Sequence, residues 1–163
     1  MGFTLLLWIA LALTIFWAVG LHNRLMRLRA AAVEGATAFD KQAQSFIGMT
    51  QDFALDAPLL ADLAEAADQL DLALKGLKNN PSAAKALSEC RAKYEQLQQL
   101  WVSLPEVDDA PPEQRSLWDE ASASVQFART AMNNASTAYN EALAQPPARW
   151  VAATMGFHAI GPL

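Results

Sequence analysis

The N-terminal stretch of the chain is continuously apolar. No charged side chain occurs in residues 1–21, and more than half of residues 3–21 are Leu, Ile, Phe or Val. A helix over residues 3–21 spans roughly 28 Å at about 1.5 Å per residue, which matches the hydrocarbon core of a bilayer. The pattern predicts a single-pass transmembrane anchor at residues 1–21 that crosses the membrane through residues 3–21.

After the anchor, apolar residues recur at helical spacing. Within residues 22–55 they return every seven positions, which keeps one face of a long helix apolar. These positions are Leu25, Ala32, Phe39, Phe46 and Phe53. A second helix is expected to follow, with Asp56 as its cap and Pro58 in its first turn. Its apolar positions are Leu63, Ala67, Leu70, Leu74 and Leu77.

Asparagine and proline residues divide the rest of the chain into further helices. Residues 79–81 predict the end of the second helix and the start of a third, with Pro81 at its first position. A loop is expected over residues 105–112, and a fourth helix from there to the proline pair at 146–147. The apolar positions along one face of a helix are here called its seam. The seam of the third helix comprises Leu87, Cys90, Tyr94, Leu97, Trp101 and Leu104. The seam of the fourth helix comprises Trp118, Ala121, Val125, Ala128, Met132, Ala135, Tyr139 and Ala142.

These elements predict an all-α fold. Residues 22–163 form one domain, an antiparallel up-down bundle of about four helices with coiled-coil-like seams and a short C-terminal helix at 148–155. Because short links make neighbouring helices antiparallel, the C-terminal segment should return towards the bilayer. Its large side chains then either lie in the membrane interface or plug the open end of the bundle core. They are Trp150, Met155, Phe157 and Ile160.

The flanks of the apolar stretch favour an uncleaved anchor over a secretory signal. A signal peptide has a basic first region and a small-x-small cleavage site, and neither pattern occurs here. Arg24, Arg27 and Arg29 follow the stretch directly. By the positive-inside rule they place the bundle in the cytoplasm, although a large domain can be translocated regardless of such charges.

The charge of the chain is acidic and unevenly distributed. The formal net charge is −5, with +2 on residues 22–41 and −7 on residues 42–163. Nucleic acid is therefore not expected as a partner. Cys90 is the only cysteine, so no intramolecular disulfide can form, and the residue is expected in the core.

The sequence offers little to a catalytic or metal-binding interpretation. The only histidines are His22 and His158, and neither has a glutamate three residues before it, as the di-iron sites of helical bundles require. No phosphate-binding glycine loop, zinc-protease motif or nucleophile elbow is present. We expect no cofactor, no metal and no enzymatic activity; a metal-dependent enzyme with a carboxylate-only site is the weaker alternative.

One polar face stands out on the fourth helix. Arg129, Asn133, Ser136 and Asn140 are spaced by four, three and four residues, so they share a face beside the alanine-rich seam. Such a face either contacts a ligand or partner, or forms buried hydrogen bonds that fix the register of the bundle. The structural interpretation is favoured.

Residues 128–157 carry a recognisable set of positions: Ala128, Arg129, Asn133, Tyr139, Asn140, Pro147, Val151, Ala152, Gly156 and Phe157. Together these positions resemble the C-terminal signature of the LemA family of bacterial membrane-anchored proteins. Weaker similarities lie upstream, at Asn23, residues 25–29, residues 39–40 and residues 104–105. The resemblance implies a hydrophobic N-terminus before a helical bundle at the bacterial inner membrane.

The chain is a divergent member by this resemblance. His22 and Met132 stand where the family has tyrosine, and residues 45–48 replace an Asp-Leu-Ile-Pro element. The family has no established biochemical activity to carry over. The expected function is a non-enzymatic module that binds protein partners or self-associates at the membrane, and the alternative is a lipid-interacting module whose segment 148–163 lies on the bilayer.

Overall fold

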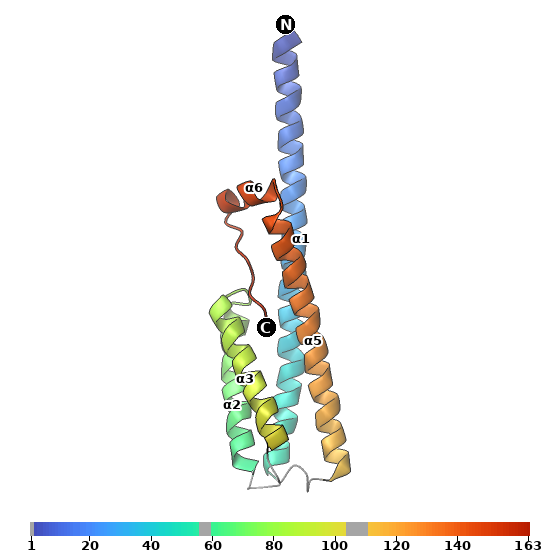
Figure 1. Ribbon diagram of the computed structural model, residues 1–163, viewed down its shortest axis with the longest axis vertical. Coiled ribbons are helices and arrows are strands. Elements are labelled where there is room, and N and C mark those ends of the chain that lie inside the picture. The colour runs from blue at the N-terminus through green and yellow to red at the C-terminus, as the bar shows by residue number, and fades with distance from the viewer. Residues whose placement is uncertain (1, 56–59, 104–110) are drawn as a thin grey trace.

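The computed structural model describes residues 2–55, 60–103 and 111–163, and the elements within these ranges are helical. They are α1 (Gly2–Leu55), α2 (Ala61–Asn79), α3 (Ala84–Ser103), α5 (Pro112–Ala144) and α6 (Ala148–Met155). Helices α1 and α5 pack along each other, and the α2–α3 hairpin packs on α1 over the half of the bundle distant from the N-terminus (Figure 1). The predicted all-α, up-down bundle with a short C-terminal helix is therefore confirmed.

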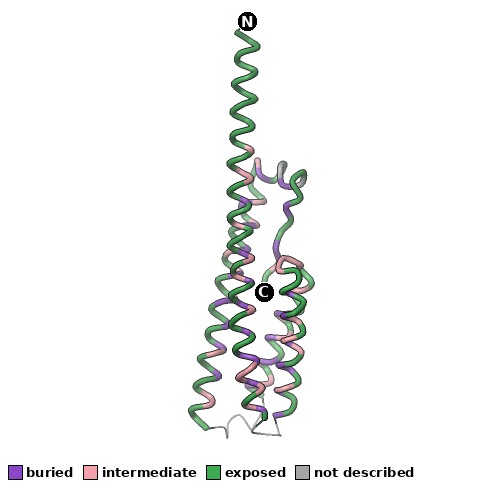
Figure 2. The backbone as a smooth tube through the Cα atoms, turned by 180° about the vertical axis from the view of Figure 1, so that it is seen from behind, coloured by how far each residue is buried: buried purple, intermediate pink, exposed green. Residues whose placement is uncertain are grey.

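The predicted anchor and the first bundle helix are one continuous helix. The N-terminal part of α1 extends beyond the bundle and is exposed along its length (Figure 2). It contains a segment long and apolar enough to cross a membrane, none of which is buried against the rest of the chain.

The predicted apolar seams form the core. The five apolar positions of α2 are all buried, as are Leu25, Ala32, Phe39 and Phe46 of the heptad in α1. On α5 the buried set runs through Trp118, Val125, Met132 and Tyr139, but Ser122 and Ser136 are buried where Ala121 and Ala135 are only partly so. The predicted seam is therefore confirmed at its large residues and at Ala128 and Ala142, whereas Ser122 and Ser136 take the buried places expected for Ala121 and Ala135.

Aromatic rings fill the end of the bundle distant from the N-terminus. Trp101 and Trp118 stack with ring centroids 4.0 Å apart and an interplanar angle of 6°. Phe46 packs on Trp118 at 4.9 Å, and Phe53 on Trp101 at 5.5 Å. These contacts join α1, α3 and α5, and stacked or tilted aromatic pairs add roughly 0.5–1.5 kcal/mol each to the burial of their surface.

The predicted start of the third helix is wrong. Pro81 does not begin the third helix: it lies in a turn, and α3 starts at Ala84. Asn80 ends α2, and its carbonyl accepts a hydrogen bond from the Ala83 N–H at 3.1 Å, which closes a turn around Pro81. The cap at Asp56, Pro58 in its turn and the 104–105 element lie outside the described residues.

The C-terminal segment turns back at Gly156. Helix α5 ends at Ala144, before the proline pair, and α6 crosses the end of the bundle from which the exposed part of α1 emerges (Figure 1). Gly156 ends α6 with φ 71°, a left-handed conformation that glycine adopts without a steric penalty. Residues 156–163, here called the tail, then run back along the bundle.

Candidate functional site

The predicted polar face of α5 contacts the tail. Asn140 donates from Nδ2 to the Ile160 carbonyl at 2.8 Å and accepts at Oδ1 from the Ile160 N–H at 3.0 Å. Asn133 binds Leu163 in the same way, at 3.1 Å and 2.8 Å. Each side-chain amide thus satisfies both backbone polar groups of one tail residue.

The spacing of the two asparagines matches an extended chain. Seven residues along a helix rise roughly 10.5 Å, and three residues of extended chain cover about 10 Å. The tail side chains that follow this register, Ile160 and Leu163, are buried at 3% and 1% exposure. The tail is therefore fixed by paired hydrogen bonds and by burial of its apolar side chains.

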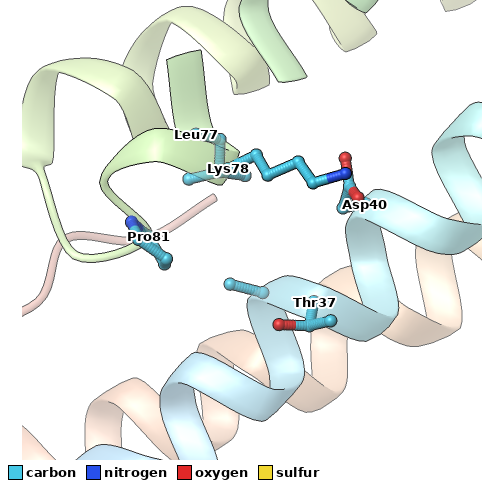
Figure 3. A pocket seen from close by; sticks show the side chains of 6 residues that line it. Thr37, Asp40, Leu77, Lys78 and Pro81 are labelled. Carbon is cyan, nitrogen blue, oxygen red and sulfur yellow. The ribbon is translucent and has the colours of Figure 1, made fainter. Parts of the chain in front are cut away.

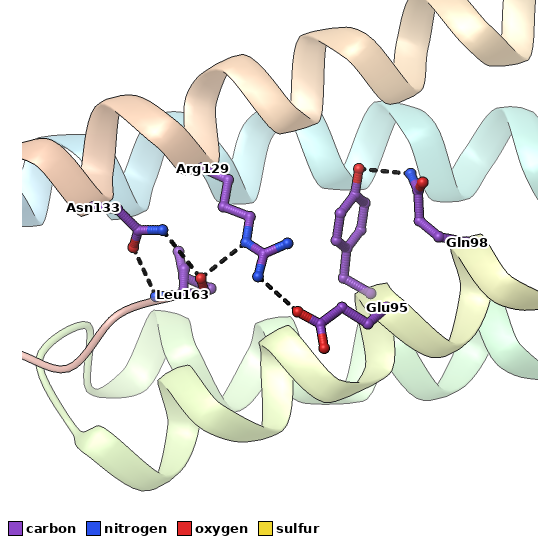
Figure 4. Close-up of polar contacts among 6 residues, drawn as sticks. Glu95, Gln98, Arg129, Asn133 and Leu163 are labelled. Atoms are coloured by element: carbon purple, nitrogen blue, oxygen red, sulfur yellow. Dashed lines mark hydrogen bonds and ion pairs between the residues drawn. The ribbon is translucent and has the colours of Figure 1, made fainter.

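Arg129 completes the contact with the tail and links it to α3. Its Nε donates to the Leu163 carbonyl at 2.8 Å, and its Nη2 pairs with Glu95 Oε1 at 2.7 Å (Figure 4). The guanidinium carbon also lies 5.9 Å from the centroid of the Tyr94 ring. The Arg129 side chain is 18% exposed and that of Glu95 50%, so solvent screens the pair and its contribution is at most about 1 kcal/mol.

A second polar group lies deeper between α3 and α5. Gln98 donates to the Tyr94 hydroxyl at 2.7 Å and to Ser122 Oγ at 2.6 Å. The Tyr94 hydroxyl donates in turn to the Ser122 carbonyl at 3.4 Å. Burial raises the pKa of the Tyr94 phenol, so the ring stays neutral and its hydroxyl acts as a structural hydrogen-bond donor.

Ser136 does not share the role of its three neighbours on the predicted face. It is 3% exposed, and its hydroxyl has no hydrogen-bond partner among the described residues; the same holds for the Tyr139 hydroxyl one turn away. Burial raises the pKa of Tyr139, and the charge of Arg29 opposes this shift. The face thus divides into Arg129, Asn133 and Asn140, which hold the tail, and a serine in the core.

Two other residues of the signature position the start of the tail. Phe157 is buried and its N–H bonds to the Ala152 carbonyl at 3.1 Å. Its ring lies 5.5 Å from the His22 ring on α1. The glycine and phenylalanine at 156–157 therefore direct the chain back onto the bundle. Asn23, the upstream residue of the resemblance, is exposed on α1 and has no such role.

A small pocket that sequence reasoning missed lies between α1 and the end of α2. It has a volume of about 190 Å³, and Lys78 extends across it towards Asp40 (Figure 3). Burial raises the pKa of the Asp40 carboxyl, and the Lys78 charge opposes the shift. The only sequence signal was an aspartate that directly follows Phe39 of the apolar seam.

The groups available for catalysis are few. Among residues 2–55, 60–103 and 111–163, no group of three or more His, Cys, Asp or Glu side chains is placed to hold a metal ion. Cys90 is fully buried, and burial raises the pKa of its thiol to about 12. The thiol is therefore protonated at neutral pH and shielded from reagents.

An open groove follows the outer junction of α1 and α5. It has a volume of about 530 Å³. Its lining comprises Ala38, Gln42, Glu120, Ala123, Ser124, Phe127, Ala128 and Ala131. Phe127 is 78% exposed, although a phenylalanine on a bundle helix usually enters the core. The groove therefore combines short side chains, which permit close approach of a backbone, with one exposed aromatic ring.

A comparison of the chain with protein-family models, curated proteins and solved structures found no match.

Proposed function

We propose that this chain is a LemA-type, membrane-tethered scaffold of the bacterial inner membrane that binds protein partners and carries no catalytic centre. In this proposal residues 3–21 cross the membrane and the bundle stands in the cytoplasm. Support for the anchor is the first part of α1, which contains a segment long and apolar enough to cross a membrane, none of it buried in the bundle. Support for the cytoplasmic side is the arginine cluster that follows it.

The signature residues support the LemA proposal through their structural roles. Asn133 and Asn140 hold the tail, Gly156 reverses the chain, and Phe157 packs beside α1. Together these residues fold the tail back onto α5. They thus belong to one architecture, as expected for a signature that defines a shared fold.

The groove along α1 and α5 is the observation that carries the scaffold proposal. The exposed Phe127 on α5 leaves apolar surface in water, which a partner would cover. The alanines around it allow a partner helix to approach closely, in the manner of helix-in-groove recognition. The rim carries Gln42 and Glu120, which can bind polar groups at the edge of such a contact.

Site-specific crosslinking tests this proposal. A photoreactive phenylalanine at Phe127 in the full chain should form a discrete adduct in native membranes, whereas one at the similarly exposed Leu72 of α2 should not. Ala131→Glu, which places a charge in the groove, should abolish the adduct. The identified partner must also crosslink at Phe127 when the two purified proteins are mixed.

The opposite results would contradict the proposal. Equal crosslinking at Phe127 and Leu72, or an adduct that survives Ala131→Glu, would show that the groove is not a binding site. An adduct that contains two copies of this chain would identify self-association as the interaction.

A further inference from the structure

Helix α6 lies at the level where the anchor enters the bundle. The ring centroids of His22 and Phe157 lie 5.5 Å apart. The C-terminal end of α6 therefore lies beside α1 at His22, the first residue after the apolar stretch 3–21. Figure 1 shows α6 crosswise at this end of the bundle, while the N-terminal part of α1 continues past it. If residues 3–21 span a bilayer, α6 is the part of the bundle nearest to its surface.

The outward face of α6 has the character of an interfacial helix. Ala148 and Ala152 are buried against the bundle at 3% and 4% exposure. Trp150 lies between them in sequence, about 200° around the helix from Ala148, and is 69% exposed. Its face therefore points away from the bundle, and an indole ring with an apolar body and one N–H is suited to the headgroup region of a membrane.

The charges at this level are mainly basic, against the acidic balance of the whole chain. Arg24, Arg27, Arg29 and Arg149 are exposed there. Two exposed carboxylates, Glu34 and Glu141, are the acidic groups of the adjacent turns of α1 and α5. A bilayer surface that carries anionic phospholipids is complementary to this arrangement.

We propose that α6 is a lipid-binding element: it lies on an anionic membrane surface with Trp150 among the headgroups and Arg149 and the α1 arginines on lipid phosphates. The proposal deepens the proposed function and rests on its membrane anchor. It also limits the lipid contact of the C-terminal segment to α6, because Phe157, Ile160 and Leu163 of the tail are buried in the bundle. The contact would hold the bundle at a fixed angle to the membrane.

Spin-label depth measurements on the full chain in nanodiscs test this. Single cysteines replace Ile9 in the anchor, Trp150 in α6, or Leu117 at the far end of α5, each 49% or more exposed. Cys90 stays in place because it is buried, and the wild-type chain controls for its labelling. The collision rates of each label with oxygen and with a water-soluble nickel complex then report its depth.

We expect the Trp150→Cys label to lie between the other two, with oxygen collisions raised and nickel collisions lowered several-fold relative to Leu117→Cys. In discs with anionic lipid it should lie deeper than in purely zwitterionic discs. Arg149→Gln should reduce this difference, whereas Arg115→Gln, at the far end of the bundle, should leave it unchanged.

Two results would overturn the proposal. In the first, the Ile9→Cys label lies in lipid, but the Trp150→Cys label is as exposed to water as the Leu117→Cys label. This result would refute the α6 contact and leave the anchor intact. The other is a depth that does not depend on anionic lipid, which would remove the role of the arginines. A water-exposed Ile9→Cys label would instead refute the anchor and the proposed function with it.

Discussion

At the scale of single residues, the paired amides of Asn133 and Asn140 explain how an extended segment is held against a helix. A helix has no free backbone groups along its side, so it cannot pair with an extended chain as a strand does. The asparagine side chains supply one donor and one acceptor each at the required spacing. On the surface of α5 the two side chains thus supply the hydrogen-bonding groups that the edge of a strand would supply.

Asn140→Ala should release the middle of the tail. The substitution leaves the N–H and carbonyl of Ile160 without partners, at a cost of roughly 1–3 kcal/mol to tail docking. We expect faster hydrogen exchange at the Ile160 amide and a smaller change at Leu163, which Asn133 still holds. Asn134→Ala, on the exposed side of α5, is the control, and unchanged exchange at Ile160 would contradict this role.

Asp40→Asn should stabilise the bundle at neutral pH. Burial raises the pKa of Asp40 in the folded chain above its value in the unfolded chain. The protonated carboxyl therefore favours folding at low pH, and this contribution is lost as the pH rises through the folded pKa. Asparagine stays neutral, and its side-chain oxygen can still accept the hydrogen bond from Gln44.

The measurement is thermal unfolding of the full chain in micelles, followed by circular dichroism across pH. The Tm of Asp40→Asn should exceed that of the wild type near pH 7, and the difference should vanish below about pH 4, where the aspartate is protonated. The exposed Asp52→Asn serves as the control. A lower Tm for Asp40→Asn at neutral pH would show that the Lys78 charge outweighs burial.

At the scale of elements, α1 and α5 approach each other closely at Gly35. A Cβ added to Gly35 would lie 2.8 Å from the Met132 Cα and 3.0 Å from its Cβ, whereas one added to Gly48 would meet nothing within 4 Å. The two glycines lie in the same helix with opposite surroundings. Alanine substitutions at the two positions therefore distinguish the effect of packing on stability from the effect of helix propensity.

Gly35→Ala should therefore destabilise the bundle and Gly48→Ala should not. Alanine at position 35 forces α1 and α5 apart, at a cost of roughly 1–3 kcal/mol. Alanine at position 48 gains helix propensity of about 0.5–1 kcal/mol without a clash. The measurement is again thermal unfolding in micelles, and an equal rise in Tm for both variants would contradict the close approach of α1 and α5.

Elements with strong periodicity could be predicted from the sequence, and those set by local turn chemistry could not. The heptad in α1 and the leucine seam of α2 indicated the buried faces because period and burial are directly linked. Pro81 was misplaced because proline suits both a helix start and a turn, and the Ala83–Asn80 hydrogen bond selects the turn. The spacing of Arg129, Asn133 and Asn140 indicated a shared face, but not that an extended tail covers it.

At the scale of the whole molecule, the fold consists of one long helix with two attached parts. The inner part of α1 carries the α2–α3 hairpin and α5, and the apolar segment in its outer part is not buried by the rest of the chain (Figure 1). Arg129 of α5 binds both Leu163 of the tail and Glu95 of α3, and so links the tail, α5 and α3. The contact between the tail and Arg129 could not be predicted from the sequence because it depends on the path of the chain after Gly156.

Residues 3–21 are proposed to anchor the bundle in a membrane, and the rest of the proposed function depends on this anchor. The most direct test is extraction of cell membranes at alkaline pH, with the intact mass of the retained chain. We predict that the wild type resists extraction and keeps residues 3–21. Leu11→Asp combined with Ile15→Asp should be released, because two aspartates near mid-membrane cost about 5–7 kcal/mol, against roughly 3–6 kcal/mol that favours insertion. Release of the wild type by alkali, or a mature chain that lacks residues 3–21, would contradict the account.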